Sequence, residues 1–229
     1  MNLLAFDTST EYLSLAIQKS GEIFTFDINA GQTHSQLILP QIQALLNEAK
    51  LTLNDLQGIA FGAGPGSFTG VRIAAGVAQG LGFGANLPVV PVCTLQALAQ
   101  ASGAQKVINC VDARMGEVYF AAYELVAGAW KTVVAPSLYK PDAVPAVSDT
   151  GWVGVGSGWQ TYTAVLASVY GEQLDATQPA LLPHAGALLQ LALPEFAAGR
   201  AKPAAEAQPI YIRNRVALKT AEREQGLRL

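Results

Sequence analysis

The sequence contains few charged residues, histidines and cysteines. Charged residues make up 14% of the 229 residues, against about 25% in an ordinary soluble domain. The two histidines and two cysteines form neither an HExxH motif nor a Cys/His cluster, so we predict no metal site and no cofactor. Cys93 and Cys110 lie far apart in apolar stretches, which predicts buried, reduced thiols in a cytosolic protein.

Long apolar runs and a targeting segment are also missing. No stretch approaches the roughly 20 residues that span a bilayer, and Met1–Phe6 contains no basic residue of the kind that begins a secretory signal. We therefore expect a cytoplasmic protein with no membrane contact. Because hydrophobic residues still make up 51% of the chain, we predict a permanent protein–protein interface. An alanine-rich core is the alternative explanation.

Positive charge is concentrated at the C-terminus. Residues 213–229 contain five basic and two acidic side chains, a net charge of +3, so the −3 of the whole chain leaves −6 for the remainder. Such a balance does not favour nucleic-acid binding by the body of the protein. We interpret residues 214–229 as a basic, flexible tail, with a nucleic-acid-binding arm as the alternative.

The first half of the sequence alternates between strand and helix patterns. Three strands are predicted within residues 2–29, where apolar residues alternate with polar ones. The segments that follow are predicted as a helix at 35–50, a strand at 58–62, a helix at 68–84, a strand at 89–92 and a helix at 94–101.

The second half repeats this order. Strands are predicted at 106–111, 117–125, 130–138 and 152–155, helices at 160–169 and around 188–198, and a last extended segment at 209–213. A repeated β-β-β-α-β-α order predicts an α/β protein of two related mixed-sheet domains. This pattern resembles the actin, hexokinase and sugar-kinase (ASKHA) superfamily. We place the domains at residues 1–104 and 105–213, and a late helix near 186–199 could pack back on the first.

The first hairpin is the place where proteins of that superfamily hold a nucleotide phosphate. It reads Asp7-Thr8-Ser9-Thr10 and is followed by Glu11, without the glycines that let a backbone approach an anion closely. The corresponding segment 112–117 also lacks a glycine pair. The glycines of 154–158 could form an adenosine-binding loop, but glycines after a strand are a weak signal by themselves. We interpret Asp7–Thr10 as a vestigial nucleotide loop, with an Asx-type turn at Asp7.

The Gly64–Gly70 segment, GPGSFTG, is the most specific local motif. Ser67 is placed to cap a helix that begins at Phe68. The free amides of that helix start could hold a carboxylate or a phosphate. A purely structural turn from strand to helix explains the motif equally well.

Small residues recur along the helix that follows. Gly76, Gly80 and Gly84 are spaced four apart, and Ala74, Ala78 and Gly82 form a second row. A glycine inside a helix costs about 1 kcal/mol relative to alanine, so close approach of another element is expected in compensation. That element is either the preceding helix or another subunit, and the apolar composition favours another subunit.

Five blocks in this order resemble the TsaB family of tRNA threonylcarbamoyladenosine biosynthesis proteins, formerly called YeaZ. They are Asp7–Thr10, His34-Ser-Gln-Leu37 with Pro40, GPGSFTGVRI at 64–73, Asp112–Arg114 with Gly116–Tyr119, and Pro209–Arg213. The resemblance implies a non-catalytic subunit that binds and activates a TsaD-type catalytic subunit, joined by a TsaE-type ATPase. The complex transfers threonylcarbamoyl to the adenosine 3′ of the anticodon, so this chain would meet tRNA only indirectly.

The resemblance also implies which residues meet the partner. TsaD-type proteins have two metal-binding histidines one helical turn apart, whereas this sequence has Ile38 one turn after His34, so no catalytic or metal-binding residue is expected. The two helices of the first domain would form the contact face, and the isolated chain would form a homodimer through it. The predicted partner-binding residues are His34, Leu37, Gln41, Phe68, Arg72, Ala75, Gly76, Gln79 and Gly80.

Three other functions remain open at this point. The first is an ATP-dependent small-molecule kinase of the same fold, although this sequence lacks the phosphate-binding glycines. The second is a peptidase-like protein, although this sequence has neither the metal ligands nor a clear Ser/His/Asp set. A protein that binds tRNA directly would use the basic tail.

Overall fold

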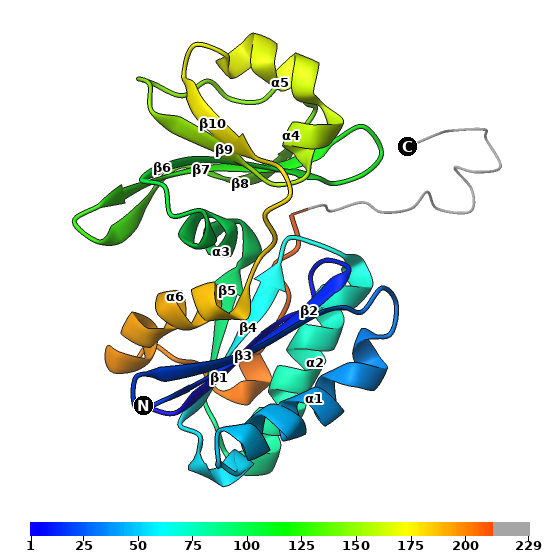
Figure 1. Cartoon of the computed structure of the whole chain (residues 1–229), viewed down its shortest axis with the longest axis vertical. Helices are drawn as coiled ribbons and strands as arrows, with labels where there is room; N and C mark the ends of the chain where they lie inside the picture. The colour runs from blue at the N-terminus through cyan, green and yellow to red at the C-terminus, as the bar shows by residue number, and fades with distance from the viewer. Residues whose placement is uncertain (213–229) are drawn as a thin grey trace, which may run out of the picture.

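The computed structural model describes residues 1–212, which form two five-stranded mixed sheets, one above the other in Figure 1. The strand order of the first sheet is β3-β2-β1-β4-β5. Its strands are β1 (Leu3–Asp7), β2 (Tyr12–Lys19), β3 (Glu22–Asn29), β4 (Gly58–Gly64) and β5 (Val89–Cys93). Strands β1, β2 and β3 pair antiparallel, whereas β4 runs parallel to both β1 and β5.

The second sheet repeats this topology in the order β10-β9-β6-β7-β8. Its strands are β6 (Lys106–Asp112), β7 (Val118–Val126), β8 (Ala129–Tyr139), β9 (Trp152–Val155) and β10 (Leu174–Gln178). Strands β6, β7 and β8 pair antiparallel, and β9 runs parallel to β6 and β10. Two sheets of the same order and strand directions confirm the predicted actin-like fold.

Helices cover both faces of the first sheet. α1 (His34–Glu48) and α2 (Phe68–Ala85) pack on one face, and α6 (Ala185–Ala197) packs on the other. Strand β1 alternates between the two cores, because Leu4 and Phe6 face α1 and α2 while Leu3 and Ala5 face α6. α3 (Thr94–Ala101) follows β5 and lies against β6 and β7, so it joins the two sheets.

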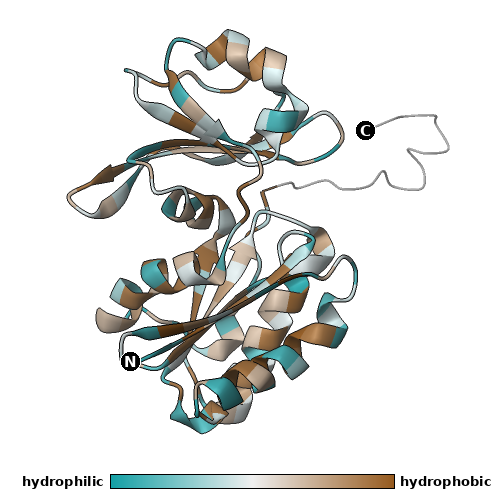
Figure 2. Cartoon of the chain, in the orientation of Figure 1, coloured by the Kyte–Doolittle hydropathy of each residue, from teal (hydrophilic) through white to brown (hydrophobic). Residues whose placement is uncertain are grey.

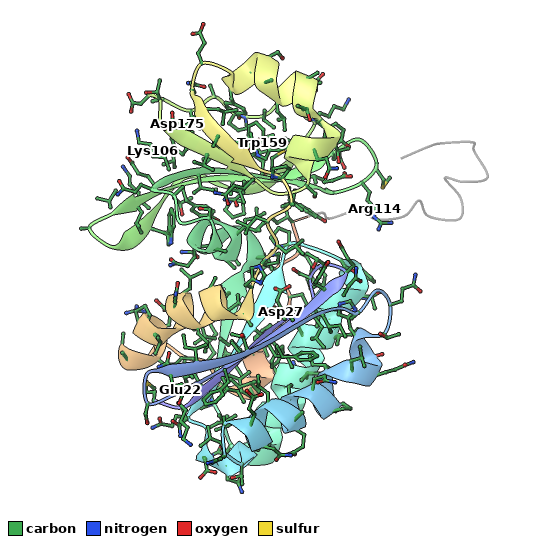
Figure 3. All side chains as sticks on the ribbon, viewed as in Figure 1. Glu22, Asp27, Lys106, Arg114, Trp159 and Asp175 are labelled. Carbon is green, nitrogen blue, oxygen red and sulfur yellow. The ribbon has the colours of Figure 1, made fainter. Side chains whose placement is uncertain are left out.

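The second sheet packs on a smaller set of helices. These are α4 (Gly158–Thr161) and α5 (Thr163–Tyr170). Trp159 of α4 is buried against the sheet, as Figure 3 shows, and its indole Nε1 donates to the carbonyl oxygen of Ile108, 3.1 Å away. In Figure 2 hydrophobic and hydrophilic residues alternate along the helices and strands of the chain. None of the helices within residues 1–212 is long and apolar enough to cross a membrane.

Two local features differ from the prediction, the helix at 160–169 and the strand β10. The predicted helix 160–169 is interrupted at Tyr162, whose φ and ψ of −120° and 31° are not helical. Strand β10 was not predicted because Leu174 and Ala176 are its only apolar residues and most of the strand is exposed. Residues 209–212, predicted only as an extended segment, belong to no helix or strand, and the Ile210 amide donates to the Ala63 carbonyl oxygen at the end of β4. Arg213 and the predicted tail 214–229 lie outside the described residues.

The chain returns to the first sheet after it has completed the second. Lys202 pairs with Val89 of β5 through hydrogen bonds of 2.7 and 2.8 Å. The 3₁₀ helix η2 (Ala204–Glu206) then packs against α2. Residues 185–212 are thus attached to the first sheet, although a boundary near residue 104 assigns them to the second half of the sequence.

Candidate protein-interaction site

The GPGSFTG motif packs directly on the first hairpin. Ser67 caps α2 as predicted, because its Oγ accepts a hydrogen bond from the Gly70 amide at 3.4 Å. The Ser67 amide donates to the carbonyl oxygen of Ser9 at 2.7 Å, and the Thr8 hydroxyl donates to the carbonyl oxygen of Gly70 at 2.7 Å. These contacts join the first hairpin to the start of α2.

The glycines of the motif allow this close approach. A Cβ at Gly70 would lie 1.8 Å from the carbonyl oxygen of Thr8, and a Cβ at Gly66 would lie 2.6 Å from that of Ser9. The hairpin backbone therefore lies where a side chain at either glycine would need to be. The sequence left open whether the motif holds an anion or is a purely structural turn from strand to helix. This packing supports the structural turn.

Asp7 forms the predicted Asx-type turn. Its Oδ1 accepts hydrogen bonds from the Ser9 amide at 2.8 Å and the Ser9 hydroxyl at 2.7 Å. Its Oδ2 has no hydrogen-bond partner among the described residues and lies against Gly62, where a Cβ would be 1.8 Å away. Burial raises the pKa of Asp7 from 3.8 to about 6, although the two Ser9 hydrogen bonds and the charge of His184 act in the opposite direction.

This pKa predicts an unusual dependence of stability on pH. Because the folded protein binds the Asp7 proton more tightly than the unfolded chain, the contribution of Asp7 to stability is present below pH 4 and is lost as pH rises towards 6. At about 1.4 kcal/mol for each pKa unit, the loss is about 3 kcal/mol. The difference in the free energy of unfolding between wild type and Asp7→Asn, measured by urea unfolding from pH 4 to 7, should show this decrease.

Asp55 provides a control, because its contribution to stability changes with pH in the opposite direction. The Thr52 hydrogen bonds hold the pKa of the Asp55 carboxyl below its usual value, so its contribution is present above pH 4 and is lost at lower pH. An Asp7→Asn difference that stays constant from pH 4 to 7 would contradict the raised pKa.

The glycines of residues 154–158 contact the protein itself. A Cβ at Gly156 or Gly158 would lie 2.9 or 2.7 Å from the carbonyl oxygen of Cys110. A Cβ at Gly154 would lie 2.4 Å from the indole of Trp159. These glycines allow the loop to pack on β6, which explains them without a bound adenosine. Cys110 is a buried free thiol as predicted, whereas the free thiol of Cys93 is only partly buried.

The two rows of small residues on α2 have different surroundings. Ala74, Ala78 and Gly82 are buried, and a Cβ at Gly82 would lie 2.6 Å from the Cβ of Ala204. In the other row, a Cβ at Gly76, Gly80 or Gly84 would have no neighbour within 4 Å outside its own helix backbone. We call Gly76, Gly80 and Gly84 the glycine stripe. The preceding helix therefore does not cover the glycine stripe.

Comparison with known proteins identifies the family. A sequence model of TsaD, tRNA N6-adenosine threonylcarbamoyltransferase, matches residues 28–155. The tRNA threonylcarbamoyladenosine biosynthesis protein TsaB of Escherichia coli K12 is 40% identical over 227 residues, which cover 96% of this chain and 97% of that protein. This chain belongs to the TsaB family. The Haemophilus influenzae TsaB is 39% identical, with 96% of each chain covered.

Solved structures agree with this assignment. The structure of YeaZ from Pseudomonas aeruginosa superposes with a TM-score of 0.83 at 39% identity, covering 92% of this chain and 99% of that one. A second structure from the same organism, described as similar to the peptidase YeaZ, gives a TM-score of 0.87 at 39% identity and covers 93% and 99%. The fold of this TsaB-family chain is therefore the fold of its solved relatives.

The residues predicted to meet a partner are not all at the surface of this TsaB-family chain. His34 is 5% exposed, and its Nε2 lies 3.2 Å from the carbonyl oxygen of Tyr12, so it attaches the start of α1 to β2. Ala75 is also buried. The other predicted residues are exposed or half-buried on α1 and α2, namely Leu37, Gln41, Phe68, Arg72, Gly76, Gln79 and Gly80.

Further exposed residues on α1, on α2 and near residue 211 were not predicted from the sequence. Phe83 is 67% exposed at the end of α2, and Leu39 of α1 is 51% exposed. Tyr211 is 51% exposed and its ring lies 6.5 Å from that of Phe68. Phe83 and Leu39 could have been found from their positions on the two helices, whereas Tyr211 is 139 residues away from its partner Arg72.

Proposed function

We propose that this chain is a non-catalytic partner subunit in the formation of threonylcarbamoyladenosine in tRNA. In this proposal it binds and activates a TsaD-type subunit, which transfers threonylcarbamoyl to the adenosine 3′ of the anticodon. Membership in the TsaB family supports a role in this pathway, since the curated relatives are described as tRNA threonylcarbamoyladenosine biosynthesis proteins. A TsaE-type ATPase joins the complex in the cytoplasm, and tRNA is reached through the complex.

The observation that most supports a binding role is the uncovered glycine stripe. A helix interior with several glycines is destabilised by about 1 kcal/mol at each relative to alanine. Within the described chain, no other element packs on Gly76, Gly80 or Gly84 to compensate. A helix of another subunit could approach this backbone closely and gain dispersion contacts. We place the TsaD-type partner on α1 and α2, and a second copy of this chain on the same face when the partner is missing.

The packing of the first hairpin supports the non-catalytic part of the proposal. In a nucleotide-binding protein of this fold, glycines of the hairpin leave room for phosphate oxygens. Here Gly66 and Gly70 accommodate the backbone of Ser9 and Thr8, and the buried carboxyl of Asp7 would repel an anion when ionised. Neither the kinase nor the peptidase alternative has a feature of residues 1–212 in its favour.

The proposal is tested by reconstitution with purified components. Unmodified tRNA, the threonylcarbamoyl donor, ATP, the TsaD-type subunit and the TsaE-type ATPase are mixed with and without this chain, and the modified nucleoside is measured by mass spectrometry. We expect product only when this chain and the TsaD-type subunit are both present. Product from this chain alone would make it an enzyme, and equal product in its absence would contradict an activating role.

A further inference from the structure

The segment Ala207–Tyr211 lies along α2 and is held there by side chains of that helix. We call this segment the C-terminal strap. Gln79 donates from Nε2 to the carbonyl oxygen of Ala207 at 2.9 Å, and Arg72 donates from Nε to the hydroxyl of Tyr211 at 2.7 Å. Between these points, the Ile210 amide donates to the carbonyl oxygen of Ala63 at 2.7 Å. The strap is thus attached at both ends and near its middle.

Arg72 is the centre of an exposed aromatic cluster. Its guanidinium carbon lies 3.6 Å above the centroid of the Phe68 ring and 5.6 Å from that of Tyr211. Such cation–π contacts, together with the hydrogen bond to the Tyr211 hydroxyl, fix the position of both rings. Phe68 is 47% exposed and Tyr211 is 51% exposed, so two large rings are held in place at the surface. Arg72 is one of the residues predicted to meet a partner, and in the structure it has contacts within its own chain.

The strap lies on one side of the glycine stripe. Successive residues of an α-helix are about 100° apart around the axis, so Arg72 and Gln79 lie on one side of Gly76 and Gly80. Ile73 and Val77 lie on the other side and pack with the core that α1 shares. The glycine stripe is therefore bordered by α1 on one flank and by the strap on the other. A helix that packed on the glycine stripe would therefore contact both α1 and the C-terminal strap.

We propose that the C-terminal strap is a third element of the partner-binding face, beside α1 and α2, and that Arg72 positions Tyr211 for contact with the TsaD-type subunit. This inference rests on the proposed function. Tyrosine, arginine and other aromatic side chains are typical of the residues that dominate binding energy at interfaces. The TsaD sequence model matches residues 28–155, which include α1 and α2 but not the strap. The strap is thus a contact that this chain adds to the helices it shares with that family.

The test measures the affinity of full-length variants for the TsaD-type subunit by calorimetry. We expect Tyr211→Ala to weaken binding at least about tenfold, because it removes an anchored aromatic contact. Tyr211→Phe and Arg72→Met, which has no N–H donor, should each weaken binding by a smaller factor. Their double variant should be no weaker than the poorer single variant, because both changes remove the same positioning hydrogen bond. Val126→Ala, an exposed position on the second sheet, is the control and should bind as wild type does.

Two further comparisons distinguish failure of this inference from failure of the proposed function. The affinities of wild type and Gly80→Leu show whether the α2 face binds the subunit at all. The affinities of the Tyr211 variants test only the strap. Wild-type binding with an unchanged or tighter affinity for Tyr211→Ala would overturn the role of the strap and leave the proposed function intact. Failure of wild type to bind would overturn both. Thermal unfolding of each variant, expected to match wild type within a few degrees, excludes loss of fold as the cause of weaker binding.

Discussion

Replacing Gly80 by leucine should abolish binding to the TsaD-type subunit without unfolding the chain. A Cβ at Gly80 meets nothing within 4 Å outside its own helix, so the leucine side chain projects into the space that a partner helix would occupy. Leucine also favours the helical conformation more than glycine does. We expect affinity to fall at least about 100-fold, which corresponds to about 2.7 kcal/mol, when measured by calorimetry at a fixed salt concentration.

The matched control for this variant is Gly186→Leu. Gly186 is also a helical glycine, in the first turn of α6, and a Cβ there likewise meets nothing within 4 Å. It lies on the opposite face of the first sheet from α2, so binding should be unchanged. Equal affinity of Gly80→Leu and wild type would contradict the proposed face, and loss of folding in Gly80→Leu would mean that the glycine stripe packs within the chain.

Replacing Gly70 by alanine should destabilise the fold more than any other substitution discussed above. The new Cβ would lie 1.8 Å from the carbonyl oxygen of Thr8, and this neighbour is backbone and has no freedom to rotate away. Either the first hairpin or the start of α2 must move, which breaks the hydrogen bond from Thr8 to the Gly70 carbonyl oxygen. We expect the free energy of unfolding to fall by about 3 kcal/mol or more, measured by urea unfolding.

Gly76→Ala on the same helix is the control for this effect. No neighbour lies within 4 Å of a Cβ at Gly76 outside its own helix backbone, so alanine should raise the free energy of unfolding by about 0.5–1 kcal/mol. A small effect of Gly70→Ala would mean that the hairpin does not pack on the motif as described. The unfolding is measured at a concentration at which the homodimer proposed above is dissociated. Destabilisation of the monomeric chain by Gly76→Ala would then mean that another element of the same chain covers the glycine stripe.

Much of the fold could be predicted from the sequence, because the deciding interactions are local. The predicted helix Thr94–Ala101 and strand Trp152–Val155 have the observed bounds, since apolar periodicity depends on residues a few positions apart. The cap at Ser67 and the turn at Asp7 each depend on a hydrogen bond between residues two or three apart. The repeated order of strands and helices was likewise sufficient to predict two related sheets.

The candidate site depended on contacts between distant parts of the chain, so it could be predicted only in part. Spacing identified both rows of small residues on α2 but could not tell which one is covered. That was decided by Ala204, which returns to pack on Gly82 from more than 120 residues away. The contact of Arg72 with Tyr211 could not be predicted for the same reason, since Tyr211 lies 139 residues further along the chain. Local pattern determined which elements form, and long-range packing determined which of their surfaces remain free.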